Sequence, residues 1–349
     1  MKLYKYDGYE ILESPHGKAL YSENANYVFN VVDGQMITWG KTLKEDAEKF
    51  PAPTIADIEI TTICNGNCSF CYKSNTTKGT YMTLNTFKQL FDKLPKSITQ
   101  IAFGADYDLT SNPDIWDIMK YTRDNGVVPN VTAGKVTDEA AEKLVKLCGA
   151  VATSNYNKEV TYDSVKRLTD RGMKQVNIHQ FLSDESLVNV WTLFKDYKTD
   201  ERLSKLNAIV FLSLKQKGRG KSHQTASQKD FNKIVAYALE NNIPIGFDSC
   251  SSLKFFRSLN EKQYNTYADL TMPCESTLES SYIDVTGEFY PCSFCENIGG
   301  WEQGIDVLNC KDFVKDVWNN ERTEKFRNKL LDTKKENEYN CRNCPIYEI

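Results

Sequence analysis

The sequence of 349 residues is long enough for a barrel-sized domain with an appendage, or for two ordinary domains. Apolar residues make up 40% of it, so a large core can be buried, while the formal net charge of −4 offers no overall attraction to nucleic acid. We find no run of 18 apolar residues and no apolar signal core near Met1. We therefore expect a cytoplasmic protein with no membrane partner.

The cysteine content is the first specific signal. Eleven cysteines are present, at Cys64, Cys68, Cys71, Cys148, Cys250, Cys274, Cys292, Cys295, Cys310, Cys341 and Cys344. An odd number that includes C-x2-C pairs, without a secretion signal, favours metal-binding thiolates over a disulfide framework. With only three histidines in the chain, a zinc hydrolase built on several imidazoles is hard to assemble.

The N-terminal residues 1–53 predict a cap of β-hairpins. In the stretch 26–40, NYVFNVVDGQMITWG, an Asp33-Gly34 turn separates two β-rich runs, which is a strong hairpin signal. The FPAP segment at 50–53 then ends the pattern.

Strand and helix patterns alternate in the middle of the chain. Strands are predicted at 55–61, 98–104, 127–133, 149–155, 175–182, 208–214 and 243–249. Among the helices between them, those in 83–94, 113–126 and 227–242 show the clearest apolar stripes and caps. Repeated βα units imply parallel strands with right-handed crossovers. Six or seven such units form a complete or partial barrel, or an open doubly wound sheet.

The first motif directly follows the first of these strands. Cys64, Cys68 and Cys71 have the spacing C-x3-C-x2-C, and thiolates select zinc, copper(I) or iron–sulfur clusters. A cubane cluster needs one ligand for each of its four irons, so three clustered cysteines leave one iron unligated by protein. An open coordination position usually serves chemistry. The alternative is a structural zinc site with a distant fourth cysteine.

This motif, with the aromatic Phe70 before its last cysteine, resembles the radical S-adenosylmethionine superfamily. The resemblance covers about 55–215 and implies a partial (β/α)6 TIM-like barrel, which we place at 54–259. It further implies a [4Fe–4S] cluster with an open iron site that binds S-adenosylmethionine, and an electron donor such as flavodoxin or ferredoxin. Reductive cleavage of S-adenosylmethionine would then give a 5′-deoxyadenosyl radical that abstracts a hydrogen atom from the substrate.

The same resemblance assigns cofactor-binding positions. Gly104-Ala105-Asp106 stands where the family has Gly-Gly-Glu, a segment that holds the amino group of the cofactor's methionine largely through backbone carbonyls. Ser154 ends the fourth strand, where family members often place a polar contact to the cofactor. Phe70 is the third expected contact, within the cysteine motif.

Residues 260–349 predict a cysteine-rich α+β extension. Cys274, Gly287 and Cys292 resemble the C-x9–15-G-x4-C start of the SPASM and twitch extensions, and Cys341-x2-Cys344 resembles their closing pair. The resemblance implies that Cys274, Cys292, Cys341 and Cys344 ligate one auxiliary [4Fe–4S] cluster. Cys295 and Cys310 are left over, and Cys295 could replace one of the four. The alternative is a zinc ribbon made of Cys292, Cys295, Cys341 and Cys344.

Three further positions are candidates for chemistry at the barrel mouth. Cys250 follows the last barrel-like strand and could donate a hydrogen atom, as an epimerase requires, or it could be a buried small hydrophobe. Asp248 is a candidate acid or base, with a turn-capping role as its alternative. The basic loop 215–221 could grip a carboxylate or phosphate, or could be solvated.

Three functions are compatible with these patterns. The leading hypothesis is a radical S-adenosylmethionine enzyme that modifies a peptide or protein by C–H abstraction. The second hypothesis keeps this chemistry but takes a nucleotide or small metabolite, with the basic loop as its support. The third is a non-catalytic binding protein stapled by zinc.

Overall fold

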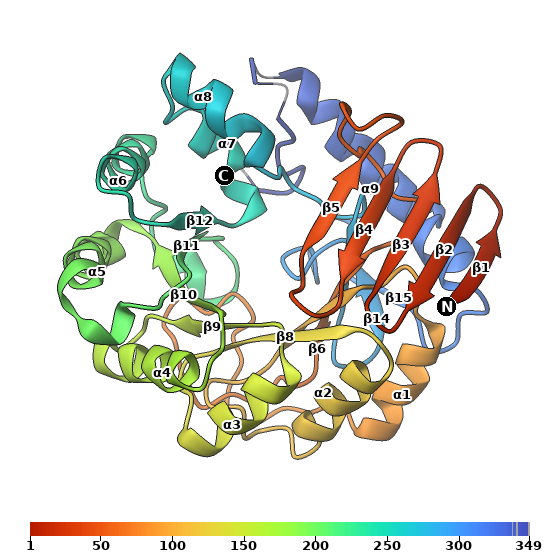
Figure 1. The fold of residues 1–349 in the computed structure, drawn as a ribbon, viewed down its shortest axis with the longest axis horizontal. Coiled ribbons are helices and arrows are strands. Elements are labelled where there is room, and N and C mark those ends of the chain that lie inside the picture. The colour runs from red at the N-terminus through yellow and green to blue at the C-terminus, as the bar shows by residue number, and fades with distance from the viewer. Residues whose placement is uncertain (337, 340, 348–349) are drawn as a thin grey trace.

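A computed structural model describes residues 1–336, 338–339 and 341–347. In the described residues a ten-stranded sheet has the order β12-β11-β10-β9-β8-β7-β6-β13-β14-β15, and helices surround it (Figure 1). The parallel strands are β6 (Ile55–Glu59), β7 (Gln100–Gly104), β8 (Val128–Ala133), β9 (Ala150–Ser154), β10 (Gln175–Leu182), β11 (Ala208–Ser213) and β12 (Ile245–Phe247). The predicted partial TIM-like barrel is confirmed, and the short β12 extends it beyond six strands.

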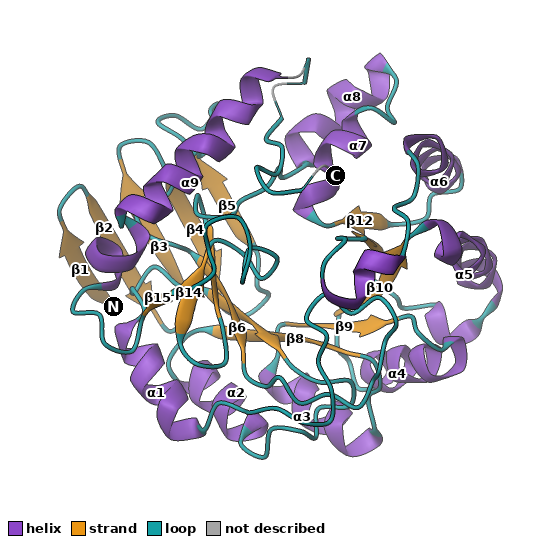
Figure 2. Ribbon diagram, turned by 180° about the vertical axis from the view of Figure 1, so that it is seen from behind, coloured by secondary structure: helices purple, strands orange, loops and turns teal. Residues whose placement is uncertain are grey.

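Helices lie on the outside of the barrel sheet (Figure 2). They are α1 (Leu84–Lys93), α2 (Ile115–Asp124), α3 (Asp138–Leu147), α4 (Lys158–Asp170), α5 (Leu187–Thr199) and α6 (Gln228–Glu240). Of these, α1, α2 and α6 fall within the predicted ranges 83–94, 113–126 and 227–242. Thr83 and Ser227 cap α1 and α6 by accepting hydrogen bonds from backbone amides, as their sequence positions predict. No helix within the described ranges is both long enough and apolar enough to cross a membrane.

The two faces of the barrel sheet differ in burial. On β10, Val176 and Ile178 are buried in the core shared with the helices, whereas the intervening Asn177 and His179 remain half-exposed. Because side chains alternate along a strand, the half-exposed set faces away from the helices and toward the barrel axis. On β6 the same face carries the exposed Asp57. The barrel interior is therefore polar and open to solvent.

The N-terminal residues form a separate antiparallel sheet. Its strands are β1 (Lys2–Tyr6), β2 (Tyr9–Ser14), β3 (Gly17–Ser22), β4 (Asn26–Asn30) and β5 (Met36–Trp39). The predicted hairpin turn joins β4 to β5, with Gly34 at a φ of +73° that favours glycine. Lys18 Nζ donates to Ile98 O (2.7 Å) and Tyr27 Oη donates to Ser97 O (2.8 Å). Since these carbonyls precede β7, the sheet lies at the N-terminal ends of the barrel strands.

The C-terminal region continues the barrel sheet. Strand β13 (Ser280–Ile283) pairs in parallel with β6, and β14 (Glu288–Tyr290) and β15 (Ile305–Asp306) add antiparallel strands. Gly287 forms the β13–β14 turn with a φ of +89°. The remaining helices are α7 (Ser252–Phe256), α8 (Glu261–Tyr267) and α9 (Glu321–Asp332), with a π-helix at Val314–Trp318. This continuity brings the C-terminal cysteines close to the barrel.

Candidate functional site

The three-cysteine loop starts where β6 ends. Hydrogen bonds from Cys64 N to Thr76 O (2.7 Å) and from Cys71 N to Cys68 O (3.2 Å) fold the loop back on itself. All three thiols are half-buried. Burial, together with the neighbouring thiols of Cys71 and Cys64, raises the pKa of the Cys68 thiol to about 11. The loop therefore gathers three sulfur donors at the C-terminal end of the first barrel strand, and this donor set fits an iron–sulfur cluster with one open iron.

The basic loop 215–221 holds this cysteine loop from outside. Arg219 Nε donates to Cys68 O (2.8 Å), and its backbone N donates to Cys71 O (3.0 Å). Gly218 has a φ of +55°, and a Cβ there would lie 2.7 Å from Cys71 O, so only glycine fits so close to the loop. The guanidinium of Arg219 is therefore bonded within the protein. The sequence had suggested it as a possible ligand for a carboxylate or phosphate.

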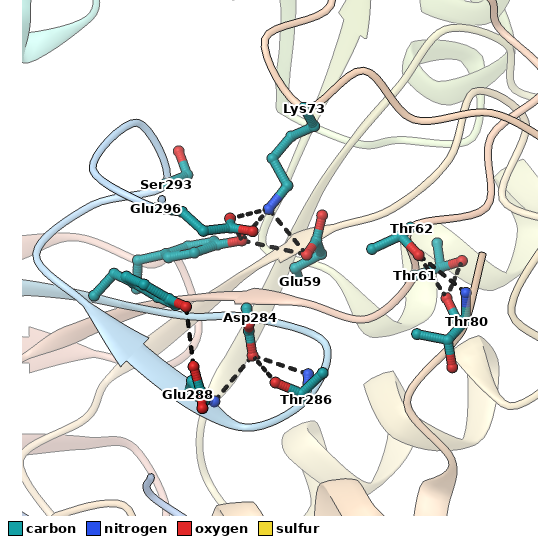
Figure 3. A network of polar contacts seen from close by, with 12 residues as sticks. Glu59, Thr61, Thr62, Lys73, Thr80, Asp284, Thr286, Glu288, Ser293 and Glu296 are labelled. Atoms are coloured by element: carbon teal, nitrogen blue, oxygen red, sulfur yellow. Dashed lines mark hydrogen bonds and ion pairs between the residues drawn. The ribbon is translucent and has the colours of Figure 1, made fainter. Parts of the chain in front are cut away.

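A buried ion-pair network connects the first cysteine loop to the C-terminal region (Figure 3). Lys73 Nζ lies 3.1 Å from Glu59 Oε2, forms a second ion pair with Glu296, and donates to Tyr282 Oη (2.8 Å). The side chains of Lys73 and Glu59 are only 10% and 7% exposed. Burial raises the pKa of Glu59, while the adjacent Lys73 ammonium lowers it. The network fixes the residue after Cys295 against the end of β6.

Two more contacts join the same loops. Lys217 Nζ donates to the backbone carbonyls of Ser293 (3.2 Å) and Glu296 (2.7 Å). The rings of Tyr72 and Phe294 lie 4.4 Å apart between their centroids. The loop that carries Cys71 and the loop that carries Cys292 and Cys295 are thus held side by side.

The C-terminal cysteines form a second group. Cys292 Sγ and Cys295 Sγ are 3.5 Å apart, and Cys344 Sγ accepts a hydrogen bond from Tyr347 N (3.4 Å). Burial raises the pKa of Cys274, and the nearby Cys250, Glu275 and Cys292 raise it further. Cys274, Cys292 and Cys344 therefore lie within one group, as the sequence predicts for ligands of an auxiliary cluster.

The other cysteines have different surroundings. Cys341 is buried beside the cationic side chains of Arg342, Arg257 and Lys334, which lower its pKa against the larger effect of burial. Cys310 is buried near Lys93, and Cys148 contacts Met119 in the core. Among the described residues, no three His, Cys, Asp or Glu side chains are close enough together to hold a single metal ion. A four-iron cluster binds each thiolate through a different iron and so requires wider spacing than a single ion.

The predicted cofactor-binding positions lie at the C-terminal ends of their strands. Gly104 ends β7, and Asp106 follows Ala105 into the next loop. Asp106 is 2% exposed. Its Oδ2 accepts from Thr110 N (3.2 Å), but its Oδ1 is buried with no hydrogen-bond partner among the described residues. Because a buried acceptor without a partner is costly, this oxygen fits a donor group on a ligand.

Phe70 and Ser154 are placed near the first cysteine loop. The Phe70 ring stacks on Phe181 at a centroid distance of 4.1 Å and contacts Tyr156 at 5.3 Å. Ser154 is buried at the end of β9. The structure thus provides an aromatic wall and a polar strand end on the side of the barrel where the cysteines lie.

Asp248 and Cys250 follow β12 on the same side. Asp248 forms an ion pair with Lys215, whose side chain is 2% exposed. Ser251 Oγ also donates to Asp248 Oδ1. Asp248 is therefore already committed to a buried lysine, and its role as an acid or base stays a prediction, as does that of Cys250 as a hydrogen donor.

Comparison with known proteins gives two findings. Residues 274–345 match the model of SPASM, an iron–sulfur cluster-binding domain. The crystal structure of Streptococcus suis SuiB bound to precursor peptide SuiA is 11% identical, with 93% of this chain and 90% of that chain covered and a TM-score of 0.67. SuiB bound to S-adenosylmethionine is also 11% identical, covering 90% of this chain and 89% of that chain, with a TM-score of 0.68. No curated protein matches the sequence.

The chain has the radical S-adenosylmethionine fold with a C-terminal SPASM domain. The predicted family resemblance and fold class are confirmed. The match to an iron–sulfur cluster-binding domain supports the predicted auxiliary cluster, and SuiB, which shares the fold, has been crystallised with S-adenosylmethionine. The assignment of individual ligand residues stays a prediction.

The sequence reasoning missed the residues that join the two loops. Lys73 stands two positions after Cys71, and Glu296 directly follows Cys295. The sequence signal for the Lys73–Glu296 ion pair is a positive charge just after the first cysteine motif and a negative charge just after Cys295. It is a weak signal, because charges next to a motif are usually solvated.

Replacing Lys73 with Met tests the buried network. The change leaves Glu59 and Glu296 buried without their shared cation, and breaking a buried ion pair from one side costs about 3–5 kcal/mol. We expect the melting temperature of the anaerobically purified protein to fall by several degrees. The matched control is Lys120→Met, which removes an exposed pair with Asp124 (62% and 58% exposed) worth less than about 1 kcal/mol. Equal small shifts for both variants would contradict the network's structural role.

Proposed function

We propose that the protein is a radical S-adenosylmethionine enzyme that modifies a peptide or protein substrate by C–H abstraction. The observation that carries the proposal is the loop of three thiols at the C-terminal end of β6, in a chain with this fold and a SPASM domain. When bound, the cluster and S-adenosylmethionine would supply reductive cleavage and a 5′-deoxyadenosyl radical. The residues of the chain hold, orient and shield these groups.

The proposed cofactor site uses residues from three strand ends. Cys64, Cys68 and Cys71 would hold the cluster. The partnerless Asp106 Oδ1 is an acceptor for the amino group of S-adenosylmethionine, a charge-assisted hydrogen bond of the stronger kind. Phe70 and Ser154 would border the same cofactor.

The polar barrel interior supports a substrate of peptide chemistry. Asn130, Thr132, Asn177 and His179 are half-exposed on the face toward the barrel axis. The surrounding barrel wall keeps part of the water away from the His179 imidazole, and this desolvation lowers its pKa to about 4, so the ring is neutral at pH 7 and can both donate and accept hydrogen bonds. Asn130 is bonded to Gln100 and Ala150 and Asn177 accepts from Asn207, so the hydroxyl of Thr132 and the neutral imidazole of His179 are the groups that match the donors and acceptors of a peptide backbone. The SuiB structure with precursor peptide SuiA supports the same substrate class by analogy.

A nucleotide or small metabolite is the weaker alternative. Its support was the basic loop, but Lys215, Lys217 and Arg219 are engaged with Asp248 and with backbone carbonyls of the cysteine loops.

The proposed radical enzyme also requires an electron donor, for which we propose a flavodoxin or ferredoxin. We also propose that the protein is cytoplasmic, because the reducing conditions of the cytoplasm keep cysteine thiolates available for iron.

Loss of the first cysteine motif should remove one cluster and all cofactor cleavage. We expect about eight irons per chain in the wild type and about four in the Cys64→Ala, Cys68→Ala, Cys71→Ala variant, since each cubane holds four. With dithionite and S-adenosylmethionine, the wild type should release 5′-deoxyadenosine and the variant none. The control Cys148→Ala removes a core thiol outside both groups and should behave as the wild type. Continued 5′-deoxyadenosine formation by the triple variant would overturn the proposal.

Isotope transfer tests the substrate class. Uniformly deuterated peptides should pass deuterium into 5′-deoxyadenosine, because the proposed hydrogen abstraction breaks a substrate C–D bond. Mass spectrometry of the nucleoside, after incubation with a deuterated peptide library or with deuterated nucleosides and sugars, distinguishes the two classes. Label from the nucleosides or sugars, with none from the peptides, would reject the peptide proposal and favour the alternative.

A further inference from the structure

A barrel cysteine lies where the barrel edge meets the SPASM domain. Cys250 belongs to a short 3-10 helix, Ser249–Ser251, that directly follows β12. Asp248, two positions earlier, is ion-paired with the buried Lys215 at the end of β11. Ser252 Oγ, two positions later, donates to Met272 O (2.8 Å), two residues before Cys274. These contacts fix the segment around Cys250 against the start of the SPASM domain.

The other SPASM cysteine segments reach the same place. The Lys215 ammonium lies 4.8 Å from the centre of the Phe294 ring, between Cys292 and Cys295 in the sequence. Tyr347 Oη donates to Phe294 O (2.9 Å), and Tyr347 N donates to Cys344 Sγ (3.4 Å). Arg342 Nη2 donates to Pro273 O (3.2 Å). The segments that carry Cys274, Cys292 and Cys344 therefore converge on the segment that carries Cys250.

We propose that Cys250 supplies a thiolate ligand to the auxiliary iron–sulfur cluster, together with Cys274, Cys292 and Cys344. The inference rests on the proposed iron–sulfur chemistry. In it, Cys250 of the barrel replaces Cys341 as the fourth ligand of the auxiliary cluster. It also replaces the predicted hydrogen-donor role of Cys250.

The surroundings fit a buried anionic centre. Thiolates bring negative charge into a site from which water is excluded, and a buried negative centre needs compensating cations. The Lys215 ammonium, 2% exposed, lies beside the group, where it also pairs with Asp248. Because Cys250 belongs to the barrel and the other three ligands belong to the SPASM domain, the cluster would also link the β12 edge of the barrel to the C-terminal extension. Structural metal sites stabilise small modules in the same way.

The test uses the full-length chain with the first motif already removed. In the Cys64→Ala, Cys68→Ala, Cys71→Ala background, only the auxiliary cluster should remain, with about four irons per chain. Adding Cys250→Ala should lower the content to about three irons or fewer, because one iron loses its ligand. Iron and sulfide analysis and the EPR spectrum of the oxidised protein measure this change. Adding Cys148→Ala instead should leave about four irons, one intact cubane.

A serine variant guards against simple misfolding. Cys250→Ser keeps the side-chain size and offers an oxygen ligand, so the reduced cluster should persist with an altered EPR spectrum and a shifted reduction potential. Full iron content and an unchanged spectrum in both Cys250 variants would overturn the inference. If the iron content is unchanged and the same Cys250 substitutions in a chain with the first motif intact stop product formation, Cys250 is the hydrogen donor and not a ligand. If instead the background variant and the wild type both lack iron, the proposed function fails as well.

Discussion

The architecture depends on one buried cation, Lys73, held between Glu59 and Glu296. Glu59 ends the first barrel strand, Lys73 follows the first cysteine motif, and Glu296 follows Cys295 in the SPASM domain. Charges so far removed from water are stable only when all partners are in place. The network therefore favours the arrangement in which the two cysteine loops lie side by side. Lys217 and Arg219 reinforce that arrangement by bonding to carbonyls of the two loops.

This constraint explains how an incomplete barrel can position a reaction. The helices bury one face of the sheet, the N-terminal sheet lies at the N-terminal strand ends, and the polar face toward the axis stays open. The loop of Cys64, Cys68 and Cys71 follows the opposite end of β6, and the SPASM domain extends the same sheet through β13. A substrate in the open interior would meet the cofactor at that end, where sites of parallel α/β folds are built.

Local patterns predicted the fold well. The strand at 175–182 agrees with β10, and the caps Thr83 and Ser227 act as expected, because periodicity and capping are local properties. Long-range partners could not be predicted in this way. Lys73 and Glu296 are 223 residues apart, and nothing near either residue names the other.

The site was predicted in part for the same reason. The three cysteines of C-x3-C-x2-C lie within eight residues, so their spacing alone predicted a shared loop, while their role as ligands with one position open stays a prediction. The basic loop 215–221 suggested a site for a carboxylate or phosphate, because a sequence cannot show whether an arginine faces solvent or an internal carbonyl. In the structure Arg219 donates to Cys68 O. The proximity of Cys250 to Cys274 depends on how β12 meets the SPASM domain, which no local pattern encodes.

The central claim is that one of two clusters has an iron reserved for S-adenosylmethionine. Mössbauer spectra of the ⁵⁷Fe-enriched wild-type protein, recorded anaerobically with and without S-adenosylmethionine, test it most directly. The account predicts that S-adenosylmethionine changes the signal of one iron in about eight and leaves the others unaltered, because only the three-cysteine cluster has an open position. Spectra that do not respond to S-adenosylmethionine, or a purified protein that holds zinc in place of iron, would contradict it.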